Sequence, residues 1–255
     1  MPIPGRRSAI SLRVCLPLKS LPLRSGSDAM WVKICANTSL EDALLAAEAG
    51  ADAVGFVFAE SLRRVTAEQV AAIVPHLPQA LEKIGVFVDA GFDEVVLTVE
   101  ACGLTGLQLH SAGDPELVAR LRGHFGDSLR ILQVIHYQQG LETQLRASQA
   151  NRAVDGVLVD SRTATLLGGT GTTYDWNAAS HAFASSAAGL RLIVAGGLNP
   201  VNVGEAIAAL RPWGVDVASG VEASPGRKDP AKVRAFVENA RIAAHRLELD
   251  ARVVV

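Results

Sequence analysis

From Val32 onward, short apolar segments alternate with amphipathic segments, and this alternation limits the folds open to the chain. Strands followed by helices along one sheet require parallel pairing with crossover helices. We expect strands at Val32–Cys35, Ala53–Phe58, Lys83–Val88, Gly106–His110, Arg130–Ile135, Gly156–Asp160, Arg191–Ala195 and Gly214–Val217. We expect helices at 40–49, 67–75, 91–101, 115–123, 138–149, 177–184, 201–210 and 230–246.

Eight such units without a linker or a change in composition favour closure of the sheet over an open, doubly wound arrangement. The predicted fold class is therefore α/β, a single parallel eight-stranded (β/α)8 barrel of the TIM-barrel class. We assign the barrel to residues 30–250 and treat residues 1–29 as an extension. Active sites of such barrels lie at the C-terminal ends of the strands.

Several helices begin or end with a capping signal. Thr38–Glu41 and Thr66–Gln69 fit capping boxes. Asn199-Pro200 and Asp229-Pro230 place a capping side chain before a proline at the first helical position. Gly50 is expected to close the first helix.

The first 29 residues differ from the rest in charge. They carry five of the 24 basic residues and one of the 26 acidic residues, so the formal charge of −2 becomes −6 for the remaining 226 residues. Three interpretations stay open: a start codon misassigned upstream of Met30, a disordered tail, or a targeting segment. The acidic body does not favour nucleic acid as a partner, and it contains no apolar run long enough for a membrane span.

Two strands end on residues capable of proton transfer. Alternation places Lys33 and Cys35 on one face of the first strand, where the ammonium group would favour the thiolate. The alternative is an inert buried cysteine. Asp160 ends the sixth strand and could act as a general acid or base, or only as a helix cap or ion-pair partner.

Small residues follow the seventh and eighth strands, where barrels of this class bind phosphate. These are Gly196-Gly197 and Ser219-Gly220. Glycine allows a ligand to approach the backbone closely. The glycine-rich segment 168–173 lacks the Gly-Lys-Ser/Thr ending of a nucleotide loop, so we interpret it as a cover over the site.

Arg63 and Arg64 follow the second strand and could bind an anion, although one of them is expected to be solvated. Gln108 and His110 share a face of the fourth strand. His110 could contact a substrate at the end of that strand, or it could be a hydrogen-bonded structural histidine. The remaining histidines have no metal-ligand spacing, and Cys15, Cys35 and Cys102 form no CxxC pair, so neither a metal nor a disulfide is predicted.

Nine motifs occur in an order that resembles the phosphoribosylanthranilate isomerase family of tryptophan biosynthesis, over about residues 31–245. They are Lys33-Ile34-Cys35 with Thr38, the run 50–58, Ser61-x-Arg63, Gly85-Val86-Phe87-Val88, Gln108-Leu109-His110, Leu158-Val159-Asp160, Gly168-Gly169-Thr170-Gly171, the run 196–200, and Asp216-x-x-Ser219-Gly220-Val221-Glu222.

The resemblance implies an Amadori rearrangement of N-(5-phosphoribosyl)anthranilate to a carboxyphenylamino-deoxyribulose 5-phosphate. It makes Cys35 the general base and Asp160 the general acid. It assigns substrate contacts to Arg63, His110 and Asp216, and phosphate contacts to Gly196, Gly197, Ser219 and Gly220. It further implies a small phosphorylated substrate, no cofactor, no metal, a cytoplasmic location, and a monomer or homodimer that binds neither nucleic acid nor a membrane.

Four positions depart from the family pattern: Ala36 and Ser111 replace glycine, Thr172 replaces lysine and Ala218 replaces serine. If the turn at Ala36 needs a positive φ, alanine strains it by about 1 kcal/mol or more.

Three alternatives stay open. One is indole-3-glycerol-phosphate synthase, whose lysine and glutamate pattern is missing here. Another is the related isomerase of histidine biosynthesis, which uses paired aspartates. The third is a barrel that binds phosphate without turnover.

Overall fold

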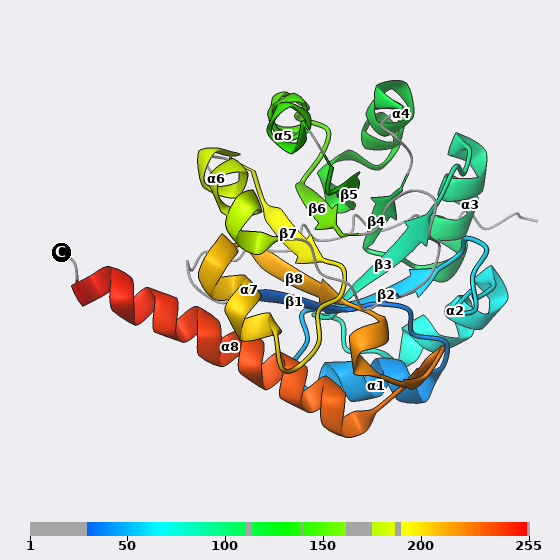
Figure 1. Ribbon diagram of the computed structural model, residues 1–255. Coiled ribbons are helices and arrows are strands. Elements are labelled where there is room, and N and C mark those ends of the chain that lie inside the picture. The colour runs from blue at the N-terminus through cyan, green and yellow to red at the C-terminus, as the bar shows by residue number, and fades with distance from the viewer. Residues whose placement is uncertain (1–29, 111–113, 139, 162–174, 187–189, 254–255) are drawn as a thin grey trace, which may run out of the picture.

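A closed barrel of eight parallel strands forms the centre of the molecule, with strand order β1-β2-β3-β4-β5-β6-β7-β8 (Figure 1). The computed structural model describes residues 30–110, 114–138, 140–161, 175–186 and 190–253. The strands are β1 (Trp31–Ile34), β2 (Ala53–Val57), β3 (Glu82–Phe87), β4 (Gly106–Leu109), β5 (Arg130–His136), β6 (Gly156–Asp160), β7 (Leu192–Ala195) and β8 (Gly214–Val217). The predicted fold class is confirmed.

Helices surround this barrel on its outside. They are α1 (Leu40–Glu48), α2 (Ala67–Ile73), α3 (Phe92–Cys102), α4 (Pro115–Phe125), α5 (Leu141–Ala150), α6 (Trp176–Ser186), α7 (Val203–Leu210) and α8 (Pro230–Val253). In Figure 1 the last helix runs beside α1 and α7 and projects past the barrel.

Two separate apolar layers follow from strand alternation. Side chains pointing outward pack against the helices in one large cluster, which includes Val32 and Ile34. Side chains pointing inward form a smaller cluster that fills the barrel: Trp31, Ala53, Ile84, Leu132, Val134, Leu158, Ile193 and Ala195. Inward-pointing residues further along these strands therefore lie nearer to the barrel mouth.

Helix starts agree with the predicted caps in two of four cases. Thr66 and Gln69 form the predicted capping box, and Asp229 accepts hydrogen bonds from the backbone N–H groups of Ala231 and Lys232. The prediction for Thr38 was wrong, because Ser39 caps α1 by accepting from the Asp42 N–H.

The fourth predicted cap also differs. The Asn199 side chain accepts hydrogen bonds from the N–H groups of Val201 and Asn202. The helix itself begins at Val203, two residues after the predicted start at position 201. Asn199 therefore closes a turn before α7. The first helix ends as predicted, with Gly50 at a φ of 87°.

After β8 the chain forms a short antiparallel hairpin before the last helix. Its strands are β9 (Glu222–Ser224) and β10 (Arg227–Lys228), and they lie beside the start of α1 (Figure 1). The hairpin was not predicted, since its strands are too short to show alternation. It supplies two buried charged side chains to the barrel mouth, Glu222 and Lys228.

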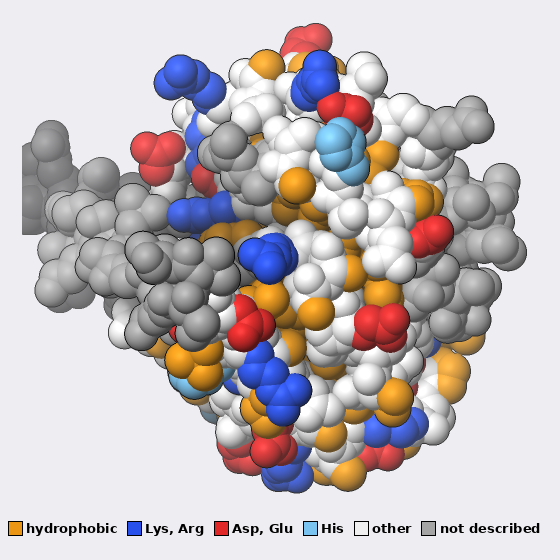
Figure 2. Space-filling view, turned by 60° about the vertical axis from the view of Figure 1, so that its left-hand side comes forward, with side chains coloured by type: hydrophobic (Ala, Val, Ile, Leu, Met, Phe, Trp, Pro, Cys, Tyr) orange, Lys and Arg blue, Asp and Glu red, His pale blue; other side chains and the backbone are white. Residues whose placement is uncertain are grey.

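Figure 2 shows acidic and basic side chains intermingled over one face, without a continuous basic patch on that face. Within the part of the chain that the structure describes, no helix has both the length and the apolar character needed to cross a bilayer.

Candidate active site

A chain of buried polar side chains crosses the barrel interior beneath its mouth. Lys33 Nζ donates to Asp216 Oδ1 and to Gln108 Oε1, both at 2.9 Å. The Gln108 amide in turn lies 3.1 Å from Nε2 of His110. Lys33 points inward as predicted, like Trp31 two residues before it, and Asp216 is its neighbour in the register of β1 and β8. The structure thus brings together His110 and Asp216, which the sequence assigned to the substrate pocket.

Lys33 keeps its positive charge inside the barrel. Burial lowers the pKa of an ammonium group, but the Asp216 carboxylate and the neighbouring Cys35 outweigh burial and raise the pKa of Lys33. Asp216 therefore serves as the counter-ion of Lys33, a function that sequence alone did not assign to it.

Cys35 directly follows β1 and is buried at the barrel mouth. Its N–H donates to the Val217 carbonyl oxygen at 2.8 Å, which anchors it to β8. Burial raises the pKa of the Cys35 thiol, and the Asp216 carboxylate adds to this, while Lys33 lowers the pKa without reversing the shift. Lys33 therefore favours the thiolate as expected, but burial has the larger effect on the pKa of Cys35.

Ala36 has a φ of 62°, so the turn after Cys35 does require a positive φ. The predicted strain at this departure from the family pattern is present.

Asp160 is the last residue of β6, buried, and two positions beyond the inward-pointing Leu158. A Cβ atom added to Gly196 would lie 2.6 Å from Asp160 Oδ1. The Gly196 backbone therefore packs directly against the carboxyl group, and only glycine fits there.

His136 lies opposite Asp160 in the register of β5 and β6, and its ring centroid is 5.9 Å from that of His110. Its Nδ1 is buried without a hydrogen-bond partner among the residues that the structure describes. The predicted strand ended at Ile135 and so left out His136, which is the last residue of β5. Strand alternation from Leu132 would have identified it.

Arg63 is held at the rim by Glu222. Its Nε and Nη2 donate to the two carboxylate oxygens at 2.8 and 2.7 Å, and this bidentate contact raises the pKa of the guanidinium. Arg64 instead pairs with Glu60 at an exposed position. The expectation that one of the two arginines is solvated is confirmed.

The turns after β7 and β8 lie in contact with each other. A Cβ atom on Gly220 would lie 1.8 Å from the Leu198 carbonyl oxygen, so the two backbones meet there. These turns contain the four residues predicted to bind phosphate: Gly196, Gly197, Ser219 and Gly220. Backbone N–H groups in such turns are able to donate hydrogen bonds to a bound anion.

Two predictions lie outside the described residues, namely the cover at 168–173 with Thr172, and Ser111. Among the described residues, no group of three or more His, Cys, Asp or Glu side chains is arranged to hold a metal ion. Glu222 appeared in a motif without a role, and Lys228 carried no sequence signal.

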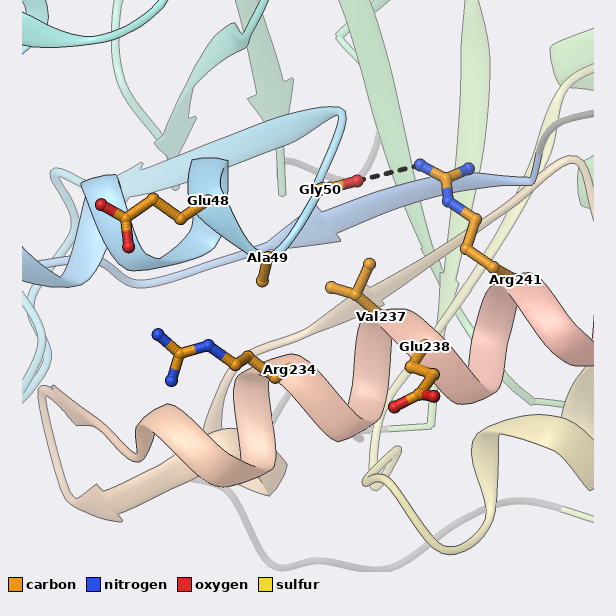
Figure 3. A pocket seen from close by; sticks show the side chains of 7 residues that line it. All are labelled: Glu48, Ala49, Gly50, Arg234, Val237, Glu238 and Arg241. Atoms are coloured by element: carbon orange, nitrogen blue, oxygen red, sulfur yellow. Dashed lines mark hydrogen bonds between the residues drawn. The ribbon is translucent and has the colours of Figure 1, made fainter.

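A groove of about 410 Å³ lies at the opposite pole of the barrel (Figure 3). Its lining is Glu48, Ala49, Gly50, Arg234, Val237, Glu238 and Arg241, from the end of α1 and from α8. Arg241 donates to the Gly50 carbonyl oxygen and pairs with Asp52 just before β2. The groove contains none of the predicted site residues.

The fold and the mouth geometry define a (β/α)8-barrel protein whose mouth combines buried ionisable side chains with two glycine-containing turns. Residues 32–239 match the family model described as N-(5′-phosphoribosyl)anthranilate (PRA) isomerase. The chain belongs to this family.

Relatives at the sequence and structure levels agree. An N-(5′-phosphoribosyl)anthranilate isomerase from Citrifermentans bemidjiense is 43% identical over 211 residues, covering 82% of this chain and 96% of the relative. The crystal structure of the Thermotoga maritima isomerase is 35% identical with a TM-score of 0.72, covering 83% of this chain and 98% of the other.

A third relative was solved with reduced 1-(o-carboxyphenylamino)-1-deoxyribulose 5-phosphate. It is 33% identical with a TM-score of 0.69, at 83% and 98% coverage.

Proposed function

We propose that Cys35 is the general base and Asp160 the general acid of this isomerase. The chain is a phosphoribosylanthranilate isomerase of tryptophan biosynthesis, converting N-(5-phosphoribosyl)anthranilate to 1-(2-carboxyphenylamino)-1-deoxyribulose 5-phosphate. The two residues supply the two proton transfers that this Amadori rearrangement needs.

The proton steps follow from the chemistry of the substrate. Asp160 protonates the furanose ring oxygen, and the nitrogen lone pair opens the ring to an imine. The Cys35 thiolate then removes the proton from C2′, and the electron pair forms an enolamine. Protonation at C1′ and loss of the proton from the C2′ hydroxyl group convert this enolamine into the ketone.

One observation supports this assignment most directly: the order of strands around the mouth. β7 and β8 lie between β6, which ends on Asp160, and β1, which leads into Cys35. A phosphate bound by the turns after β7 and β8 would hold the sugar between the acid and the base. Proximity of this kind is worth several orders of magnitude in rate.

We propose further that Arg63, His110 and Asp216 line the substrate pocket. Arg63 would meet an anionic group of the substrate at the rim, and Glu222 keeps its guanidinium in place. His110 lies at the end of the polar chain that begins at Lys33. Gly196, Gly197, Ser219 and Gly220 would contact the phosphate through backbone N–H groups and the serine hydroxyl.

A fluorescence assay tests the acid assignment. Phosphoribosylanthranilate is generated fresh, and its fluorescence disappears on rearrangement. We expect turnover by the wild type and a loss of at least ~100-fold for Asp160→Asn, the usual scale for a general acid. Retention of wild-type rates by Asp160→Asn would contradict the assignment.

A barrel that binds phosphate without turnover is the second candidate, because Ala36 and Ala218 stand at site positions. An inactive wild type that still bound the reduced product analogue would establish that candidate.

We propose residues 30–250 as the barrel domain, with 1–29 as an extension. Support comes from β1, which starts at Trp31, and from the family match at 32–239. We also propose that the protein is cytoplasmic and that it is a monomer or a homodimer. Cell fractionation and sedimentation equilibrium test these two points, and a membrane-bound protein or a larger oligomer would contradict them.

A further inference from the structure

Three parts of the site meet at one buried ammonium group, that of Lys228 on β10. Its Nζ donates to the Cys35 carbonyl oxygen at 2.6 Å and to the Ala218 carbonyl oxygen at 3.2 Å. It also lies 3.4 Å from Glu222 Oε1. Its three N–H groups match these three acceptors, and its side chain is inaccessible to solvent.

Each acceptor belongs to a different functional part. The Cys35 carbonyl is part of the peptide that leads into the strained turn at Ala36. The Ala218 carbonyl precedes Ser219 and Gly220, the second phosphate turn. Glu222 is the residue that holds Arg63.

The charges at this junction depend on one another. Burial lowers the pKa of Lys228, and Glu222 and Cys35 only partly offset this. Burial acts to raise the pKa of Glu222, but Arg63 and Lys228 outweigh it and lower that pKa. The Glu222 carboxylate is thus shared by Arg63 and Lys228, and removing either cation changes the electrostatic potential at the other.

Docking of the hairpin does not depend on this ammonium group alone. Thr38 Oγ1 donates to the Gly226 carbonyl oxygen at 2.6 Å, and Arg227 pairs with Glu41. The Lys228 N–H also donates to Asp42. These contacts join the hairpin to the region of α1 without touching the site, so the ammonium group is available for another function.

We propose that Lys228 is a positioning residue, which sets the backbone of Cys35, the second phosphate turn and the Arg63–Glu222 pair in one arrangement. The inference rests on the proposed function, since it assumes that those three parts bind and convert one substrate. Lys228 itself contacts no reacting atom.

The test replaces Lys228 with methionine, which keeps the length of the stem and removes the donors. Lys83→Met is the matched control. Lys83 is also buried, and its Nζ donates to the Pro78 and Gln79 carbonyl oxygens. Its acceptors precede β3, at the pole opposite the mouth. Both variants lose a buried ammonium group bonded to backbone oxygens.

Steady-state kinetics and calorimetric binding of the reduced product analogue give the readouts. Misplacement of a site by about 1 Å costs on the order of 100-fold. For Lys228→Met we therefore expect a roughly 10–100-fold lower kcat/KM, with a lower kcat, a higher KM and weaker analogue binding. Lys83→Met should lower the unfolding temperature and leave kcat and KM within about 3-fold, because it is distant from the mouth.

Wild-type kcat, KM and analogue affinity in a folded Lys228→Met would overturn the inference, as would equal losses in Lys83→Met. If Lys228→Met does not fold, Glu222→Gln decides, since it keeps the side-chain volume and removes the shared charge. Weakening of the analogue by about 10-fold, the scale of a lost charged hydrogen bond, supports the inference, and unchanged binding overturns it. Asp160→Asn tests the proposed function separately, so the two failures are distinguishable.

Discussion

Ala36 adopts a backbone conformation that normally belongs to glycine, immediately after the proposed catalytic cysteine. A left-handed alanine costs about 1–2 kcal/mol, whereas a glycine loses about 0.5–1 kcal/mol more conformational entropy on folding. The strain is therefore only partly offset by the stiffer unfolded chain.

Ala36→Gly is expected to stabilise the protein by about 0.5–1 kcal/mol, the difference between these two terms. Urea unfolding measures it. Ala218→Gly is the control, because Ala218 has a φ of −120° and gains no such relief. A destabilised Ala36→Gly, or an equal gain in the control, would show that the turn is not strained.

The ionisation of Cys35 gives a pH dependence at the same scale. Its pKa in the folded protein lies above the ordinary value of 9.0, so the thiol is the favoured form. The stabilisation that this shift implies is complete below the unfolded pKa and is lost as pH rises through the folded pKa.

Alkylation of Cys35 by iodoacetamide, followed by peptide mass spectrometry, measures this ionisation. Since the thiolate is the reactive form, we expect slow labelling at pH 8 and a rate that still rises above pH 9. Unfolded protein provides the control, in which the same peptide should show an ordinary thiol profile. A plateau below pH 8 in the folded protein would contradict the expected direction.

At the scale of elements, the polar chain through the barrel replaces what would otherwise be an apolar layer. Lys33 on β1 and Asp216 on β8 are neighbours in register and form an ion pair at 2.9 Å. Breaking a buried pair by removing one partner leaves an uncompensated charge and costs about 3–5 kcal/mol.

Asp216→Ala should therefore lower the free energy of unfolding by about 3–5 kcal/mol. The double variant Lys33→Met/Asp216→Leu removes both charges, and we expect it to recover most of that loss while remaining inactive. Urea unfolding and the fluorescence assay measure the two effects. Equal destabilisation of the single and double variants would indicate lost packing as the cause.

The sequence could predict features that depend on neighbouring residues, but not contacts between residues distant in sequence. Strand alternation placed Lys33 on the inward face and Gln108 and His110 on a common face, since period-two geometry is local. Asp216 was identified only through the family resemblance. Alternation could not reveal that Asp216 neutralises Lys33, because the partners are 183 residues apart. The expected effect of Lys33 on Cys35 is present, since Lys33 lowers the pKa of the thiol, but the larger opposing effect of burial depends on the folded structure.

The hairpin was missed because β9 and β10 contain only three and two residues. Its contribution comes from contacts distant in sequence, such as Lys228 with Cys35, 193 residues apart. The start of the first helix differed from the prediction because the expected capping side chain forms a hydrogen bond elsewhere. Thr38 donates to Gly226, which leaves Ser39 to cap α1.

At the scale of the whole molecule, the barrel closes through β1, which pairs with both β2 and β8. A variant beginning at Met30 retains every strand of this closure. We expect its unfolding temperature to lie within about 2 °C of the full chain, the shift of a fraction of a kcal/mol for a domain of this size.

Differential scanning calorimetry measures this temperature. A variant beginning at Ala36, which lacks β1, is the control and should not show a cooperative transition. Failure of the variant that begins at Met30 to fold would contradict the proposed domain boundary.

The central claim is that an acid and a base on opposite sides of the phosphate turns perform the isomerisation, and the rate of Cys35→Ser tests it most directly. In the phosphoribosylanthranilate fluorescence assay, we expect this variant to lose at least ~100-fold in kcat. Cys102→Ser, which changes the buried cysteine at the end of α3, should keep a rate close to that of the wild type. A Cys35→Ser enzyme as fast as the wild type would show that Cys35 is not the base.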